Sequence, residues 1–137
     1  MDSDTPSHDV ALILVVIEAP RLRRLTARAL ANAGYEVIEA ASAPQALLVA
    51  GRPDDRVDLV VCDAHLADGE GASLVTAIRA AQGAVRCVYL SDAADQPDVR
   101  SDGTPADDAL ATTLETPIPG AALLEAVRAA LAADQRE

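Results

Sequence analysis

Two acidic residues follow strongly apolar stretches of the chain, at places where carboxylates can do chemistry. Glu18 comes directly after the run ILVVI, and Asp63 comes directly after LVVC. If these runs are neighbouring strands of a parallel sheet, about 5 Å apart, both carboxylates meet at one edge. Two like charges there are unfavourable unless a proton or a cation neutralises them, and Mg²⁺ prefers such oxygen ligands. The alternative, for each residue taken alone, is an acid that caps the following helix or faces solvent.

The elements that must position these acids alternate along the chain between strand-like and helix-like patterns. Apolar or alternating runs predict strands at residues 10–17, 35–39, 58–62, 85–90 and 109–114. Helical spacing predicts helices from Pro20 to Gly34, over 42–50 and 72–81, and from Pro119 onward. An Asp-rich stretch interrupted by Pro97, Gly103 and Pro105 predicts an irregular fourth helix. Five strands alternating with five helical stretches indicate a doubly wound α/β sandwich, whose functional edge is the carboxyl end of its strands.

The length and composition indicate one domain with a packed core rather than a disordered chain. The chain has 137 residues, of which 50% are hydrophobic, and a chain of this size buries about two thirds of its surface on folding. Residues 1–9 are polar and are expected to form a flexible leader. We expect residues 10–133 to form the domain and residues 134–137 a frayed tail.

Charge and scarce residue types disfavour several classes of function. The net charge is −11, which repels phosphate backbones, so nucleic acid is not an expected partner. All basic residues are Arg, and the chain has no Lys. Cys62 and Cys87 are too few for a disulfide scaffold or a four-thiolate zinc site, and we expect buried, inert thiols. No apolar run approaches the roughly 20 residues of a membrane helix and no signal peptide is visible, which predicts a cytoplasmic protein without membrane contact.

Four stretches of the sequence, in their order and spacing, resemble the receiver domain of two-component response regulators. They are ILVVIEAPRLRRLTARALANAGYEVIEAAS, DLVVCDAHLADGEG, VRCVYLSDAAD and LETPIPGAALLEAVRAAL, and the resemblance covers residues 10–133. It implies a flavodoxin-like (βα)5 fold with strand order 2-1-3-4-5. It also implies a signalling module that accepts a phosphoryl group from a histidine kinase or a histidine phosphotransfer protein. Output would pass to a downstream protein through the face of the fourth helix, fifth strand and fifth helix.

The resemblance assigns roles to individual residues. It places the phosphoacceptor at Asp63 and the switch hydroxyl, which bonds the phosphoryl group, at Ser91. Mg²⁺ would be held by Glu18, Asp63 and the backbone carbonyl of His65. The chain is therefore not expected to be an enzyme beyond Mg²⁺-dependent self-phosphorylation and dephosphorylation of Asp63.

The chain departs from the family pattern at positions that handle charge. Ile17 stands where the family has the first of two acids, and Thr116, before Pro117, stands in place of its lysine. Asp92 occupies a position that is usually small, and Ala67 replaces a proline. Phosphoryl transfer depends on neutralising the transferred oxygens, and losing one such contact costs about 2.7–4 kcal/mol. We therefore expect a degenerate receiver with a weakened Mg²⁺ site, unless Asp92 turns toward the metal and replaces the missing acid.

Two other functions stay open at this point. A phosphorylation-independent pseudo-receiver would bind its partner constitutively. Ile17 and Thr116 favour this function, whereas Asp63, Glu18 and Ser91 speak against it. A phosphatase-type hydrolase with an aspartyl nucleophile usually needs a second acid two residues later, and His65 in that place speaks against it. The four arginines at positions 21–28 form either the solvated face of a helix or part of a surface that meets a kinase.

Overall fold

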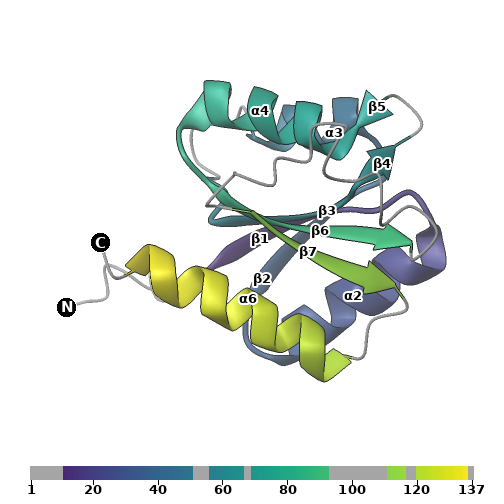
Figure 1. The fold of residues 1–137 in the computed structure, drawn as a ribbon, viewed down its shortest axis with the longest axis vertical. Coiled ribbons are helices and arrows are strands. Elements are labelled where there is room, and N and C mark those ends of the chain that lie inside the picture. The colour runs from purple at the N-terminus through teal and green to yellow at the C-terminus, as the bar shows by residue number, and fades with distance from the viewer. Residues whose placement is uncertain (1–10, 51–55, 67–68, 93–110, 117–119, 136–137) are drawn as a thin grey trace.

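A parallel sheet lies at the centre of the computed structural model, which describes residues 11–50, 56–66, 69–92, 111–116 and 120–135 (Figure 1). The described part of the chain contributes five strands to it: β1 (Leu12–Val16), β2 (Glu36–Ala40), β3 (Leu59–Asp63), β6 (Arg86–Asp92) and β7 (Ala111–Thr116). Their order is β2-β1-β3-β6-β7, and each neighbouring pair is parallel. Counted along the chain, this is the order 2-1-3-4-5, so the predicted flavodoxin-like α/β fold is confirmed.

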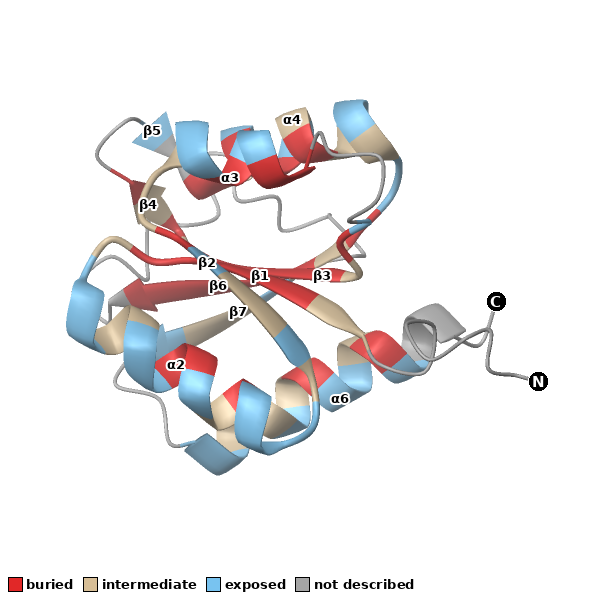
Figure 2. Cartoon of the chain, turned by 180° about the vertical axis from the view of Figure 1, so that it is seen from behind, coloured by how far each residue is buried: buried red, intermediate tan, exposed pale blue. Residues whose placement is uncertain are grey.

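Helices cover both faces of the sheet. The helices α3 (Ala43–Ala50) and α4 (Gly71–Gln82) lie on one face, and α2 (Pro20–Asn32) and α6 (Gly120–Gln135) lie on the other (Figure 1). Buried residues concentrate on the central strands and on the helix sides that face them (Figure 2). The result is two apolar cores separated by the sheet.

The continuous apolar run of β1 follows from this double coverage. Successive side chains of a strand point to opposite faces. Leu14 and Val16 accordingly join the core with α3 and α4, whereas Ile13 and Val15 join the core with α2 and α6. All four side chains are fully buried. A strand buried on both faces needs apolar residues at every position, which is why β1 shows no alternation.

Three features near the strand ends differ from the sequence prediction. The fifth strand lies at Ala111–Thr116 rather than 109–114, and β6 continues to Asp92, because backbone pairing carries both strands beyond their apolar residues. A short antiparallel pair, β4 (His65–Leu66) and β5 (Gly69–Glu70), follows β3 and was not predicted. The predicted leader at residues 1–9 and most of the stretch predicted to form the irregular fourth helix lie outside the described residues.

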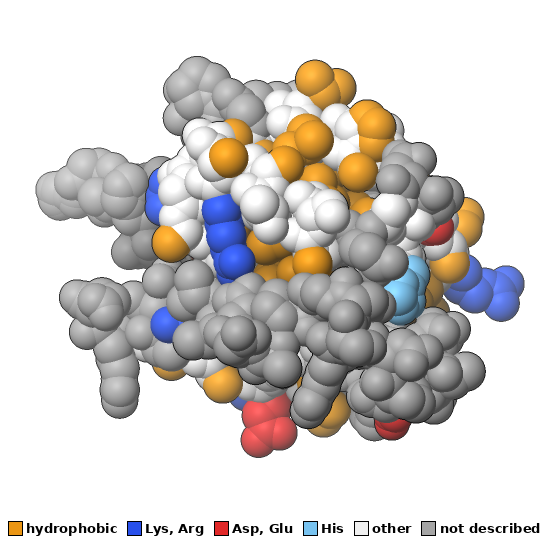
Figure 3. All heavy atoms as spheres, turned by 45° about the horizontal axis from the view of Figure 1, so that its top comes forward, with side chains coloured by type: hydrophobic (Ala, Val, Ile, Leu, Met, Phe, Trp, Pro, Cys, Tyr) orange, Lys and Arg blue, Asp and Glu red, His pale blue; other side chains and the backbone are white. Residues whose placement is uncertain are grey.

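Some large apolar side chains remain at the surface of the helical layers. Figure 3, which brings the side of α3 and α4 forward, shows hydrophobic side chains gathered there. On α3, Leu48 is 72% exposed, and on α2, Leu25 is 59% exposed although it belongs to the apolar helical repeat. Among the helices of the described ranges, none has the length and apolar character required to span a bilayer.

Candidate functional site

The carboxyl ends of the strands bring the predicted site residues to one edge of the sheet. Val16, which is two residues before Glu18, pairs with Cys62, which is directly before Asp63. On the other side of β3, Asp63 pairs with Leu90, which directly precedes Ser91. Ends of parallel strands share one edge, so the register places Glu18, Asp63 and Ser91 together, as the sequence predicted.

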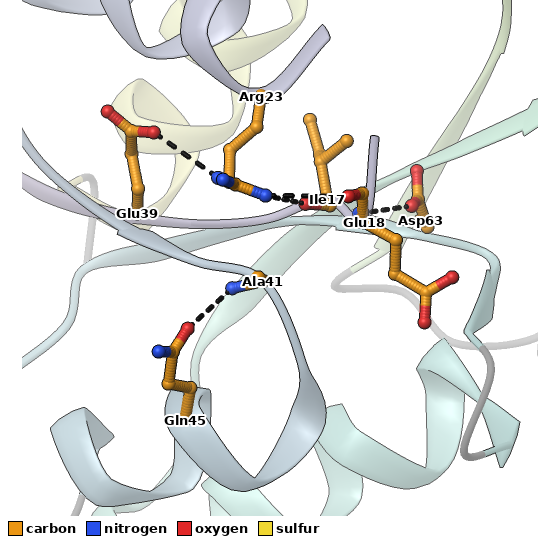
Figure 4. Close-up of polar contacts among 7 residues, drawn as sticks. All are labelled: Ile17, Glu18, Arg23, Glu39, Ala41, Gln45 and Asp63. Atoms are coloured by element: carbon orange, nitrogen blue, oxygen red, sulfur yellow. Dashed lines mark hydrogen bonds and ion pairs between the residues drawn. The ribbon is translucent and has the colours of Figure 1, made fainter. Parts of the chain in front are cut away.

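A hydrogen bond joins the two acidic positions. The backbone N–H of Glu18 donates to the Oδ2 atom of Asp63 over 3.0 Å, and both residues are half-buried (Figure 4). The Glu18 carboxylate lies at the far end of its side chain, away from this bond (Figure 4). The sequence predicted two carboxylates meeting at this edge, whereas the bond links the carboxylate of one residue to the backbone of the other. A hydrogen bond donated to a carboxylate favours its charged form.

Ile17, the residue before Glu18, belongs to the apolar core instead of the acidic edge. Its side chain is fully buried in the core that β1 shares with α2 and α6. Its backbone N–H donates to the carbonyl oxygen of Ala40 over 3.2 Å, which continues the pairing of β1 with β2. The chain thus uses this position for packing and supplies no carboxylate from it.

The loop after Asp63 is tied to its surroundings by backbone hydrogen bonds. The N–H of Ala64 donates to the carbonyl of Leu90 over 2.8 Å, and the N–H of Gly71 donates to the carbonyl of Ala64 over 2.8 Å. A methyl group on Gly71 would clash with the backbone oxygen of Asp63 and would lie 3.1 Å from the Cys62 sulfur. The absence of a side chain at Gly71 therefore lets the start of α4 approach the end of β3.

The remaining predicted site residues lie around this loop and on the adjacent strands. Ser91 is 2% exposed near the end of β6, an unusual place for a hydroxyl unless it is hydrogen-bonded. His65 is half-buried in β4. Asp92 and Thr116 pair through the backbones of β6 and β7 at the same edge, and their side chains lie outside the described part of the structure. The alternative in which Asp92 turns toward a metal therefore falls outside the described residues.

Arg23, in the first turn of α2, has a place at the site that the sequence analysis missed. Its NH1 nitrogen donates to the backbone oxygens of Ile17 over 3.0 Å and Glu18 over 3.4 Å (Figure 4). Its Nε donates to the Oε1 atom of Glu39 over 3.3 Å, so the two side chains also form an ion pair. The sequence grouped this residue with its arginine neighbours; its position five residues after Glu18 was the signal that could have distinguished it.

The two cysteines are buried thiols, as predicted. Cys62 and Cys87 are free and are 0% and 1% exposed. Burial, aided by the negative charge of Asp63, raises the pKa of the Cys62 thiol far above its usual range. Burial, aided by Cys87, likewise raises the pKa of the Tyr89 hydroxyl. The Cys62 thiol also donates to the backbone oxygen of Asp63 over 3.2 Å, a bond that favours the protonated form.

These shifts predict a loss of stability at alkaline pH. The thiol of Cys62 keeps its proton in the folded state and ionises near pH 8.5 in the unfolded chain. Its stabilising contribution is therefore fully present below about pH 8.5 and is lost as the pH rises further. Urea unfolding at pH 8 and pH 9.5 should show a drop of about 1 kcal/mol from this group. The Cys62→Ala variant should show a smaller drop, and an equal drop in both proteins would contradict the assignment.

The residues at this edge can be compared with the ligands that Mg²⁺ requires. Mg²⁺ binds to one or two carboxylates and retains several waters. Glu18 and Asp63 both lie at this edge, joined by the bond from the Glu18 N–H to the Asp63 carboxylate, and His65 follows Asp63 by two residues. Within the described ranges, no group of three or more His, Cys, Asp or Glu side chains could hold a metal. A metal there would therefore depend on the backbone and on water for its other ligands.

The surface of the molecule carries a groove with a volume of about 790 Å³. It is lined by residues of α2 and β2, and Glu39 belongs both to its wall and to the ion pair with Arg23. The groove carries basic side chains on an acidic molecule, next to apolar side chains. Its lining includes Arg21, Arg24, Leu25, Arg28 and Val37.

Comparisons with known proteins agree with this geometry. The family model described as the response regulator receiver domain matches residues 13–128. The transcriptional regulatory proteins GlrR of Escherichia coli K12 and QseF of Escherichia coli O157:H7 are each 32% identical to the chain over 92 residues. These residues are 67% of this chain and 20% of either relative, so the match spans about a fifth of the length of these proteins.

Solved structures show the same fold. The receiver domain of the hybrid histidine kinase CckA is 27% identical, with a TM-score of 0.73, over 88% of this chain and 99% of that domain. A response regulator receiver domain protein from Clostridium thermocellum has a TM-score of 0.79 at 20% identity, over 92% of this chain and 98% of that chain. The strand order, the acids at the ends of β1 and β3 and the family match over residues 13–128 lead to one conclusion: the chain belongs to the receiver domains of two-component response regulators.

Proposed function

We propose that the chain is an atypical receiver in which Asp63 accepts a phosphoryl group slowly. The observation that carries this proposal is the half-buried Asp63 carboxylate at the carboxyl edge of the sheet, bound by the N–H of Glu18. Glu18 and Ser91 at the same edge support it, because they supply the acid and the hydroxyl that this chemistry uses. The fully buried Ile17 and the absence of Lys are the reasons for a low rate.

The reaction transfers a phosphoryl group from a phosphohistidine donor or a small acyl phosphate. A carboxylate oxygen of Asp63 forms the new O–P bond while the bond from phosphorus to the donor breaks, and the donor leaves with the electron pair. Glu18, Asp63 and the carbonyl of His65 would hold Mg²⁺, which when bound neutralises charge on the transferred oxygens. The Ser91 hydroxyl donates a hydrogen bond to a phosphoryl oxygen, which couples phosphorylation to the conformation of β6.

The departures from the family pattern at Ile17, Asp92 and Thr116 weaken the stabilisation of negative charge. Ile17 removes a carboxylate from the metal site, and Thr116 removes an ammonium from the phosphoryl group. Each lost contact corresponds to a factor of about 100 to 1,000 in rate, although effects within one site are not additive. Asp92 increases the negative charge at the same edge. The chain therefore keeps the nucleophile but lacks part of the charge that assists it.

The proposed partner is a histidine kinase or a histidine phosphotransfer protein, and the groove on α2 supports this partner. Arg21, Arg24 and Arg28 recur at helical spacing and offer guanidinium groups to acidic side chains. The exposed Leu25 and the half-buried Val37 offer apolar contact between these arginines. A downstream partner would use the face of β7 and α6 together with the predicted fourth helix.

A second candidate function is a pseudo-receiver that binds its partner without phosphate. The observation that favours it is the packing of Ile17, because an apolar side chain has replaced a metal-binding acid there. In that case the Asp63→Asn variant binds the partner as the wild type does, with or without an active kinase. In the proposed function, the kinase changes partner binding of the wild type and leaves the variant unchanged.

Incubation with Mg²⁺ and a small acyl phosphate, followed by intact-mass measurement, tests the proposed function. We expect the wild type to gain one phosphoryl group slowly and the Asp63→Asn variant to gain none. The Asp58→Asn variant is a matched control, because Asp58 also lies next to β3 but bonds the backbone N–H of Leu12 at 2.8 Å, outside the site. Equal modification of wild type and Asp63→Asn would place the acceptor elsewhere and overturn the proposal.

A further inference from the structure

We propose that Arg23 is a positioning residue for Asp63, acting through the peptide group between Ile17 and Glu18. This inference rests on the proposed role of Asp63 as phosphoacceptor. The guanidinium of Arg23 binds the carbonyl end of that peptide group, and the N–H end of the same group binds the carboxylate of Asp63 (Figure 4). Arg23 thereby transmits part of its positive charge to a carboxylate that it does not touch.

The two hydrogen bonds form one continuous chain. NH1 of Arg23 donates to the oxygen of Ile17 over 3.0 Å, and the nitrogen of Glu18 donates to Oδ2 of Asp63 over 3.0 Å. The oxygen of Ile17 and the nitrogen of Glu18 belong to one planar amide, in which electron density moves from nitrogen to oxygen. A cation at the oxygen end therefore makes the N–H a stronger donor. Chains of hydrogen bonds of this kind strengthen each member by about 10–30%.

The environment favours this transmission of charge. The Arg23 side chain is 17% exposed, so water screens its charge less than on an open surface. Neither hydrogen bond requires the side chain of Ile17, which remains packed in the apolar core. The chain has no Lys whose ammonium could stabilise the Asp63 carboxylate directly. The guanidinium of Arg23 instead stabilises that carboxylate through the backbone, by making the Glu18 N–H a stronger donor.

Arg23 is itself held in place by a carboxylate from the neighbouring strand. Its Nε donates to Glu39 of β2 over 3.3 Å, while NH1 reaches the two backbone oxygens on the other side of the guanidinium (Figure 4). These simultaneous contacts use the planar fork that only Arg provides. A Lys at this position keeps the charge but cannot bind Glu39 and both carbonyls in the same geometry.

The test uses the amide signal of Glu18 in the metal-free, unphosphorylated protein. In nuclear magnetic resonance spectra, we expect Arg23→Met to shift the Glu18 amide proton upfield and to raise its hydrogen-exchange rate by about 3- to 10-fold. Arg23→Lys should give an intermediate change. Arg128→Met is the charge-matched control, because Arg128 lies on the exposed surface of α6, and it should leave the Glu18 signal unchanged.

A double-mutant cycle separates transmission through the peptide group from a merely structural role. If Arg23 acts on Asp63 through this group, its effect on the Glu18 signal is smaller in an Asp63→Asn background, where the charged acceptor is absent. A structural role predicts equal shifts in both backgrounds. Equal shifts, or an unchanged Glu18 signal in Arg23→Met, would overturn the inference.

A second readout connects Arg23 to the chemistry. We expect Arg23→Met to lower the initial rate of Asp63 phosphorylation by a small acyl phosphate by about 3- to 10-fold. Arg128→Met should react as the wild type does. A wild-type rate in Arg23→Met would overturn the inference while leaving the proposed function intact. Failure of the wild type to react would instead refute the proposed function, and the Glu18 signal would still decide whether Arg23 acts through the peptide group.

Discussion

The Thr116→Lys variant should accept a phosphoryl group at Asp63 about 100-fold faster than the wild type. Thr116 ends β7, and its backbone pairs with Asp92 at the same edge of the sheet as Asp63. A Lys there introduces an ammonium on a flexible stem, which can follow the transferred oxygens as their negative charge develops. The wild-type chain contains no Lys that could do this. Initial rates with Mg²⁺ and a small acyl phosphate, measured by intact mass, give the ratio directly.

Thr112→Lys is the matched control for this prediction. Thr112 is an exposed residue of the same strand and lies four residues before Thr116, at which the strand ends. That separation is about 13 Å along the strand, beyond one Debye length at physiological salt. We expect Thr112→Lys to react within about twofold of the wild type. Equal rates for both lysine variants would mean that overall charge, and not a cation at the site, limits the reaction.

The Gly71→Ala variant should lose about 2–3 kcal/mol of unfolding free energy. Gly71 begins α4, and a methyl group there would clash with the backbone oxygen of Asp63 and lie 3.3 Å from the backbone oxygen of Ala64. Backbone oxygens cannot rotate away as a side chain can, so α4 or the end of β3 must move. The same shift should disturb Asp63, and we expect the phosphorylation rate to fall with the stability.

Gly120→Ala provides the comparison, because Gly120 begins α6 as Gly71 begins α4. A methyl group at Gly120 would meet nothing within 4 Å. Replacing a helical Gly by Ala in open space stabilises a protein by about 0.4–1 kcal/mol. Chemical denaturation of the two variants therefore should give changes of opposite sign. Similar changes in both would show that the close approach at Gly71 does not constrain the loop after Asp63.

The fold could be predicted from sequence because strands buried on two faces leave a strong pattern. The runs that became β1 and β3 contain almost only apolar residues, and helical spacing between them fixed the alternation of the α/β sandwich. The ends of β6 and β7 were less predictable. Their last residues pair through the backbone and need no apolar side chain, so composition gives no signal for them.

The place of Glu18 and Asp63 at one edge of the sheet could be predicted from the sequence, but the contact between them could not. Asp63 and Glu18 could be identified because each acid follows an apolar strand. The hydrogen bond from the N–H of Glu18 to the carboxylate of Asp63 could not be predicted, because every non-proline residue has the same backbone N–H. The role of Arg23 was hidden for a similar reason, since two of its three acceptors are backbone oxygens.

The most direct test of the weakened phosphoacceptor site is a time course of Asp63 modification with and without Mg²⁺. The wild type is mixed with excess acyl phosphate, in Mg²⁺ or in a chelator, and its intact mass is followed until the reaction ends. We expect a single phosphoryl group, gained slowly in Mg²⁺, more slowly still in the chelator, and absent from Asp63→Asn. Rapid stoichiometric modification would contradict the weakened site, and a complete lack of modification would contradict the phosphoacceptor.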